Sequence, residues 1–231
     1  MVYGIAKMIN FAHGDIIMVG AYTLYIGIAL LHLPVIAAML LTAVVCSVLG
    51  VLIEKIAYKP LRNAPPLAVL ITAIGMSYFL QSVALLIFSS TPIPFKSVIN
   101  LDSVQVGSVN ISGITIVTLA VTTVIMVALT LFINKPKAGS AMRAVSEDRG
   151  AAELMGINVN GTISMTFAIG SALAAVAGIL YICQYQSLRP TLGALPGIKA
   201  FVAAVLGGIG SVPGAMLGGI TAYTAGSGTL V

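Results

Sequence analysis

Three polar side chains stand close together near the start of the chain, in the stretch MINFAHGDIIMVGAY (residues 8–22). Asn10, His13 and Asp15 supply an amide, an imidazole and a carboxylate, which can donate and accept hydrogen bonds, bind a cation or move a proton. A charge-free run extends from residue 16 to residue 53 directly after them. Polar groups beside such a run are costly in lipid and tend to face the protein interior or a cavity.

Covalent chemistry at this stretch is poorly supported. The chain has two histidines, His13 and His32, and it contains neither an HExxH motif nor paired carboxylates within its apolar runs. The two cysteines, Cys46 and Cys183, lie inside apolar runs. Small packing residues are the expected role of such thiols, rather than a disulfide or a metal pair. The pattern therefore does not favour an enzyme.

The composition indicates a membrane protein. Hydrophobic residues make up 59% of the chain and charged residues 7%, against about 25% charged in an ordinary soluble domain. Stretches without Asp, Glu, Lys or Arg cover 16–53, 63–95, 103–134, 154–188 and 200–231. Each could supply the roughly 20 apolar residues of a membrane-spanning helix. We expect an all-α, polytopic bundle with spans near 14–30, 34–55, 67–88, 114–133 and 162–183, then a broken segment from 198 to the end.

The basic residues orient this bundle. Polar loops are predicted at 54–66, 89–113, 134–161 and 184–197, so alternating crossings place the first and third loops on one side. That side collects eight of the eleven bases: Lys7, Lys55, Lys59, Arg62, Lys135, Lys137, Arg143 and Arg149. The positive-inside rule makes it cytoplasmic. The bases flank apolar runs and form no stripe, so they do not indicate nucleic-acid binding.

The tail contains the glycine-rich stretch GGIGSVPGAMLGG (residues 207–219). No Lys-Ser or Lys-Thr follows it, so it is not a nucleotide-binding P-loop. Gly210, Gly214 and Gly218 recur every four residues and predict close helix packing. Pro213 and the doubled glycines, including Gly208, predict a break in the helix. Such a break either serves packing alone or also lines a watery pathway.

The third loop, NKPKAGSAMRAVSEDRGAAELMGINVNGT (residues 134–162), holds most of the remaining charge. Residues 140–155 favour a helix that is broken only by Gly150, and Gly156 is placed to end it. Two interpretations stay open. The segment is either a solvated amphipathic connector or a short helix that seats in a groove of a partner protein.

The residues AAELMGIN in this loop resemble the coupling-helix region of ABC importer permeases, whose signature is Glu-Ala-Ala…Gly, although Gly150 stands before the alanines here. The stretches MVYGIAKMINFAHGD, EKIAYKPLR, LITAIGMSYFLQ and KAFVAAVLGGIGSVPGAMLGG extend the resemblance over nearly the whole chain. Together they are similar to the LivH-type permeases of branched-chain amino acid importers. From the resemblance we expect a first helix of the family before Met1 and its final helices after Val231, outside the given sequence. We therefore expect one permease domain over 1–231, cut at both ends, with a cytoplasmic coupling loop at 138–157.

The resemblance implies an ATP-driven importer of leucine, isoleucine and valine in the prokaryotic inner membrane. The implied partners are a second permease subunit, two cytoplasmic ABC ATPases, an extracytoplasmic amino-acid-binding protein and membrane lipid. The chain itself would bind no cofactor, because ATP is used by the ATPases. The resemblance assigns the ATPase-coupling role to Arg143, Glu147, Asp148, Ala151, Ala152, Leu154, Met155 and Gly156. Alternatives are the same machine carrying urea, short amides or other amino acids, and an ATP-independent transporter or channel.

Three accounts of the opening stretch compete. Asn10, His13 and Asp15 lie solvated at the cytoplasmic interface, or satisfy freed backbone groups at a helix break centred on Gly14, or touch the substrate. A carboxylate could pair with the ammonium group of an amino acid, but an importer fed by a binding protein needs only weak contact. We favour the structural break near the pathway. The pathway or break residues are Asn10, Phe11, His13, Gly14, Asp15, Gly208, Gly210, Pro213 and Gly214.

Overall fold

A computed structural model describes residues 4–5, 10–62, 64–99, 102–106, 109–208 and 210–227. Five of the described helices are long and apolar enough to cross a membrane, which confirms the predicted spans. They are α2 (His13–Tyr25) with its continuation η1 (Ile26–Leu30), α3 (Val35–Ile53), α4 (Pro66–Phe88), α5 (Gly113–Asn134) and α8 (Val159–Tyr185).

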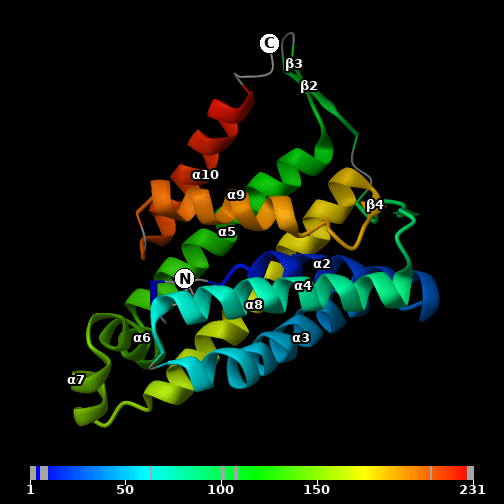
Figure 1. Ribbon diagram of the computed structural model, residues 1–231. Helices are drawn as coiled ribbons and strands as arrows, with labels where there is room; N and C mark the ends of the chain where they lie inside the picture. The colour runs from blue at the N-terminus through cyan, green and yellow to red at the C-terminus, as the bar shows by residue number, and fades with distance from the viewer. Residues whose placement is uncertain are drawn as a thin grey trace.

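Helices α2, α3 and α8 form the centre of the bundle (Figure 1). Glycines allow this close approach. A Cβ atom built on Gly178 of α8 would lie 2.4 Å from the carbonyl oxygen of Ile17. A Cβ atom built on Gly50 of α3 would overlap the side chain of Ser171 on α8. Gly170, Ala174 and Gly178 are buried on one face of α8, as their spacing predicts.

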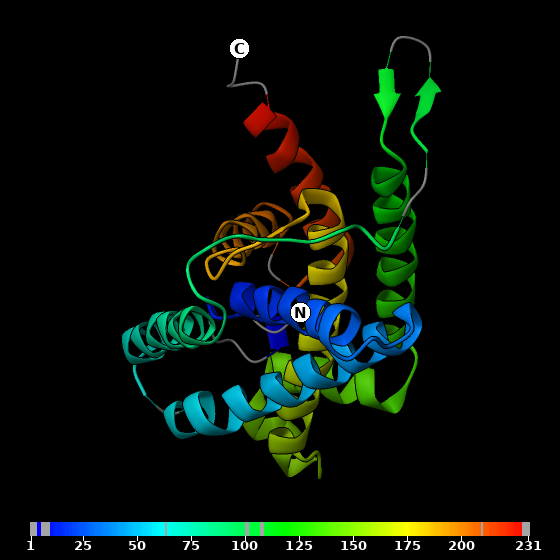
Figure 2. The same cartoon turned by 90° about the vertical axis from the view of Figure 1, so that its right-hand side faces the viewer.

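Helices α4 and α5 lie at the edge of the bundle, and Figure 2 shows α5 standing to one side. Among its described residues, α5 buries just Gly113 and Ile114, and large side chains such as Leu119 and Val124 are exposed. Apolar side chains facing outward along a helix of 22 residues suit contact with lipid or with another apolar helix rather than with water.

The loops meet at two opposite ends of the bundle, as the alternating crossings predict. At one end β1 (Ile93–Pro94) pairs antiparallel with β4 (Ser187–Leu188), joining the second and fourth loops. The hairpin of β2 (Val104–Val106) and β3 (Val109–Ile111) projects from the second loop.

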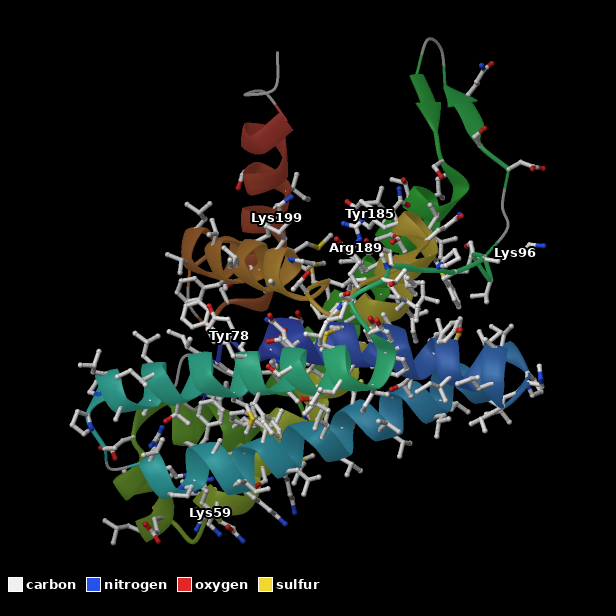
Figure 3. The ribbon with its side chains drawn as sticks, turned by 45° about the vertical axis from the view of Figure 1, so that its right-hand side comes forward. Lys59, Tyr78, Lys96, Tyr185, Arg189 and Lys199 are labelled. Atoms are coloured by element: carbon white, nitrogen blue, oxygen red, sulfur yellow. The ribbon has the colours of Figure 1, made fainter. Side chains whose placement is uncertain are left out.

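At the other end Arg62 donates a hydrogen bond to Asn160, which joins the first and third loops. In Figure 3, Lys59 lies at this end, whereas Lys96 and Arg189 lie at the opposite one. Lys7, which the charge count also assigns to the Lys59 end, lies outside the described residues.

The first loop is shorter than predicted. The helix does not end near residue 54 but continues as a π-helical turn, η2 (Glu54–Tyr58), and a 3₁₀ turn, η3 (Lys59–Leu61). The reason is that Glu54 is not solvated: its side chain is fully buried and pairs with Arg62. A paired carboxylate can remain inside a helical bundle, so the charge does not mark the helix end.

The broken tail is confirmed and begins earlier than residue 198. Helix α9 (Ala194–Leu206) leads to a break, and α10 (Val212–Ser227) follows it. Gly208 and Gly210 have φ values of +85° and +101° in the break, a conformation that glycine adopts without penalty. Gly210 therefore does not share a helical face with Gly214 and Gly218. These two glycines lie in α10 and pack closely against α9.

Candidate functional site

Asp15 anchors a polar cluster inside the bundle. It is 1% exposed, and its carboxylate accepts hydrogen bonds from the Ser77 hydroxyl and, at 3.0 Å, from the Gln81 amide of α4. Of the three accounts, solvation at the interface does not describe Asp15, because α4 covers it. Ser77 and Gln81 form hydrogen bonds between helices, which is the packing role their spacing of four residues predicts.

Asn10 lies just before the turn that leads into α2, and His13 is the first residue of that helix. The Tyr58 hydroxyl of η2 donates to the Asn10 side-chain oxygen at 2.8 Å. Within the described part of the chain, Asn10 Nδ2 and His13 Nδ1 are buried without a hydrogen-bond partner. Asn10 and Asp15 thus bond to side chains of other helices. The break is not centred on Gly14, because α2 already begins at His13.

Phe11 and Gly14 contact α9 and the turn before it. A Cβ atom on Gly14 would lie 2.4 Å from the Gly193 carbonyl oxygen and 2.9 Å from the Gly197 Cα atom. The Phe11 ring lies 5.4 Å from the ring of Phe201. The start of α2 and the helix α9 therefore lie against each other, although 180 or so residues separate them in sequence.

The glycine break between α9 and α10 meets a different segment. A Cβ atom on Gly4 would lie 2.9 Å from the Gly210 Cα atom. Gly4 and Gly210 also line a small cavity of about 70 Å³ together with Met142 and Arg143. Gly208, Gly214 and Pro213 lie in or beside this break, and Pro213 is exposed. The structure therefore places the two groups of predicted pathway residues at opposite ends of α9.

The third loop folds into two helices at the Lys59 end of the bundle, α6 (Lys137–Glu147) and α7 (Arg149–Leu154). The break between them lies at Asp148 and not at Gly150. The Asp148 carboxylate accepts hydrogen bonds from the backbone N–H groups of Gly150 at 2.8 Å and Ala151 at 3.1 Å. Asp148 is therefore the N-cap of α7.

Gly156 ends α7, as predicted. Its φ is +79°. Its N–H group donates to the Glu153 carbonyl at 2.9 Å, and the N–H group of Ile157 donates to the Ala152 carbonyl at 3.0 Å. This pair of bonds is the Schellman motif, which ends a helix with glycine in the left-handed conformation. Caps at both ends fix the orientation of a helix of only six residues.

The capped helix presents an apolar surface. Leu154 is 90% exposed and Met155 is 82% exposed. Ala151 and Glu147 are also exposed. Ala152 differs from the other predicted coupling residues because it is 3% exposed and packs into the core. Ala152 therefore packs α7 against the bundle, whereas Ala151 is exposed.

Arg143 also has a local role. Its guanidinium donates to the backbone carbonyl of Ile133 and to the Ser140 hydroxyl. A cation at the last carbonyls of a helix satisfies groups that the helix itself leaves unpaired. Arg143 therefore joins the end of α5 to α6.

A second buried polar group lies where the sequence showed only a loop. Glu54 pairs with Arg62 and accepts a hydrogen bond from the Ser164 hydroxyl at 2.6 Å. Burial and the nearby Arg62 guanidinium lower the pKa of Arg149, the first residue of α7. The signal in the sequence was a Glu and an Arg about two helical turns apart in EKIAYKPLR.

Known proteins resemble this chain over most of its length. Residues 1–231 match the family described as branched-chain amino acid transport system, permease component. The chain is 47% identical to the high-affinity branched-chain amino acid transport system permease protein BraD of Pseudomonas aeruginosa, over 95% of this chain and 76% of that protein. It is 45% identical to the permease protein LivH of Escherichia coli K12, over 95% of this chain and 75% of that protein.

No solved structure matches the chain. The relatives are permease components of transport systems and not enzymes. The apolar helices and these relatives agree on a multi-pass membrane protein. The chain belongs to the family of permease components of branched-chain amino acid transport systems.

Proposed function

We propose that the chain is a transmembrane subunit of an ATP-driven importer of branched-chain amino acids in the prokaryotic inner membrane. Two cytoplasmic ABC ATPases, a second permease subunit and an extracytoplasmic amino-acid-binding protein complete the machine. The permease binds no cofactor, since the ATPases use the ATP. It performs no covalent chemistry and serves to open the path alternately to either side of the membrane.

The exposed apolar end of α7 is the observation that carries this proposal. Leu154 and Met155 are far more exposed than core residues of their type, and they lie on a loop outside the membrane-spanning helices. Exposed apolar side chains grouped on a short, capped helix mark a surface for another protein.

Movement of this helix has a direct route into the bundle. Helix α7 leads through Gly156 and Ile157 into α8, which packs against α2 and α3. When ATP clamps the ATPases together, a displacement of α7 would be carried by α8. Glu147 and Ala151 belong to the same exposed surface. Asp148 and Gly156 keep α7 in the orientation that the partner meets.

The pathway is proposed to pass beside the start of α2 and α9. Asn10, Phe11, His13, Gly14 and Asp15 line or support that passage, and the glycine break allows α9 to move relative to α10. Asp15 is already bonded to Ser77 and Gln81, so it is not free to bind an ammonium group tightly. Weak contact suits an importer that receives its substrate from a binding protein.

Uptake of labelled leucine tests the proposal. The permease, its ABC ATPases and its binding protein are reconstituted in vesicles, with unlabelled valine, urea and acetamide as competitors. We expect ATP-dependent uptake that valine alone inhibits. ATP-dependent uptake of urea or amides would support an ATP-driven importer but contradict branched-chain amino acids as its substrate. Uptake that is indifferent to ATP would overturn the importer.

A further inference from the structure

A buried ion pair lies between the coupling end of the chain and the bundle. Glu54 is fully buried, and the Arg62 side chain is 12% exposed. Arg62 bonds to Glu54 through one guanidinium nitrogen and to Asn160 through the other. Asn160 lies in the first turn of α8, a few residues after α7 ends. The ion pair therefore connects α3 directly to the segment that α7 would move.

The neighbours of this pair extend the connection. Ser164, one turn further along α8, donates to the second carboxylate oxygen of Glu54. Arg149 begins α7 and lies close enough to Arg62 for their charges to interact. Glu54 thus accepts bonds from Arg62 and from Ser164, and both connect it to the first turns of α8, directly after the coupling loop.

The π-helical turn η2 also places the polar side chain of Tyr58 against the residues just before α2. Tyr58 is fully buried, and its hydroxyl donates to Asn10 just before α2. Its ring lies 5.5 Å from the ring of Phe167 on α8. Turns of this kind are rare and occur often at functional positions. The turn that holds Glu54 therefore also holds the start of α2.

We propose that Glu54 and Arg62 are positioning residues that transmit movement of the coupling loop through the π-helical turn to the start of α2. This inference rests on the proposed ATP-driven transport. The route runs from Asn160 to Arg62, to Glu54, and through the turn to Tyr58 and Asn10. It leaves α8 at its first turn and reaches the start of α2 without passing along the rest of α8.

The chemistry favours transmission over simple stabilisation. A buried ion pair often adds no stability compared with an apolar pair of similar volume. Directional bonds from one guanidinium to two partners, Glu54 and Asn160, however, fix the relative orientation of the elements that they join. Loss of either charge should therefore weaken the link between movement of the coupling loop and movement at the start of α2, in addition to any effect on folding.

The test measures leucine taken up per ATP hydrolysed in the reconstituted full complex. Glu54→Gln and Arg62→Gln are expected to lower this ratio about tenfold, in the range of measured coupling between sites. Ser164→Ala, which keeps the ion pair and removes one bond to Glu54, is expected to lower it by a smaller factor. Lys59→Gln is the matched control, since it removes an exposed cation next to Tyr58 and should leave the ratio unchanged.

Copurification with the ATPases shows whether a variant assembles, and its melting temperature shows whether it is stable. Together they distinguish a loss of coupling from a loss of folded protein. The double variant E54Q/R62Q removes both charges and leaves no charge buried alone. If it assembles and keeps the low ratio, the inference is supported; if it regains the wild-type ratio, the pair serves folding and the inference is overturned. A wild-type ratio in Ser164→Ala would overturn it even if the charge variants do not fold. Absence of ATP-dependent uptake by the wild type would instead contradict the proposed function.

Discussion

Truncation of Leu154 and Met155 gives the sharpest test of the coupling surface. The two side chains are 90% and 82% exposed, so replacing them by alanine removes almost no contact within the chain itself. Substitutions of this kind usually change the free energy of unfolding by less than about 0.5 kcal/mol. Any large effect on transport must then come from a partner that covers these side chains.

The size of that effect follows from the buried apolar area. Fully burying a leucine or methionine side chain contributes about 1.5–3 kcal/mol relative to leaving it in water. Alanine retains one carbon, so each truncation should weaken ATPase binding by about 1–2 kcal/mol, and the pair by about 2–4 kcal/mol if the terms add. The combined loss corresponds to a roughly 30- to 700-fold increase in Kd.

Binding of the purified ATPase to the permease in detergent, followed by titration, measures this Kd. Uptake of leucine in vesicles should fall in the same order: wild type, single variants, double variant. Leu31→Ala is the matched control, because Leu31 is 56% exposed and lies at the opposite end of the bundle. Wild-type affinity in the double variant would show that α7 is a connector and not a docking helix.

Three further predictions concern packing, the intramembrane cluster and orientation. Gly178→Ala places a methyl group 2.4 Å from the Ile17 carbonyl oxygen. It should therefore destabilise the bundle by about 1–3 kcal/mol and lower the melting temperature in detergent. The control is Gly75→Ala, whose methyl group meets nothing within 4 Å and should leave the melting temperature unchanged. Asp15→Ala removes the acceptor of Ser77 and Gln81, so it should cost about 1–3 kcal/mol in the same assay, and a melting temperature equal to that of the wild type would contradict the bonded cluster. Cysteines replacing Met155 and Lys96 should react with an impermeant maleimide from the cytoplasmic and the outer side respectively, and labelling of both from one side would refute the topology.

The spans and their grouping could be predicted because they depend on quantities that sequence displays directly. Long charge-free runs determine where helices cross, and small residues spaced by four determine where they approach, as at Gly170, Ala174 and Gly178. The pairing of β1 with β4 and the bond from Arg62 to Asn160 agree with the parity of the loops. Gly156 was also predictable, because few other residues tolerate its positive φ.

The errors share one physical cause, which is that the role of a residue depends on partners that are distant in sequence or on local hydrogen bonds that its type alone does not reveal. Glu54 appeared to end a helix, but Arg62 and Ser164 keep it inside. Asp148 appeared to be part of a continuous helix, but its carboxylate caps α7 and interrupts the helix before Gly150. Ala152 looked equivalent to Ala151, and only the packing of α7 on the bundle distinguishes a buried methyl from an exposed one.

The buried polar atoms also bear on how the chain could handle an amino acid. Asp15 and Glu54 are each engaged by side chains from other helices. An incoming ammonium group would have to displace those bonds to form an ion pair, which makes tight binding at either carboxylate unfavourable. Asn10 Nδ2 and His13 Nδ1 differ, because within the described residues each is buried with no partner. An uncompensated buried donor or acceptor is costly, so these two side chains gain hydrogen bonds in a state in which water or substrate reaches the start of α2.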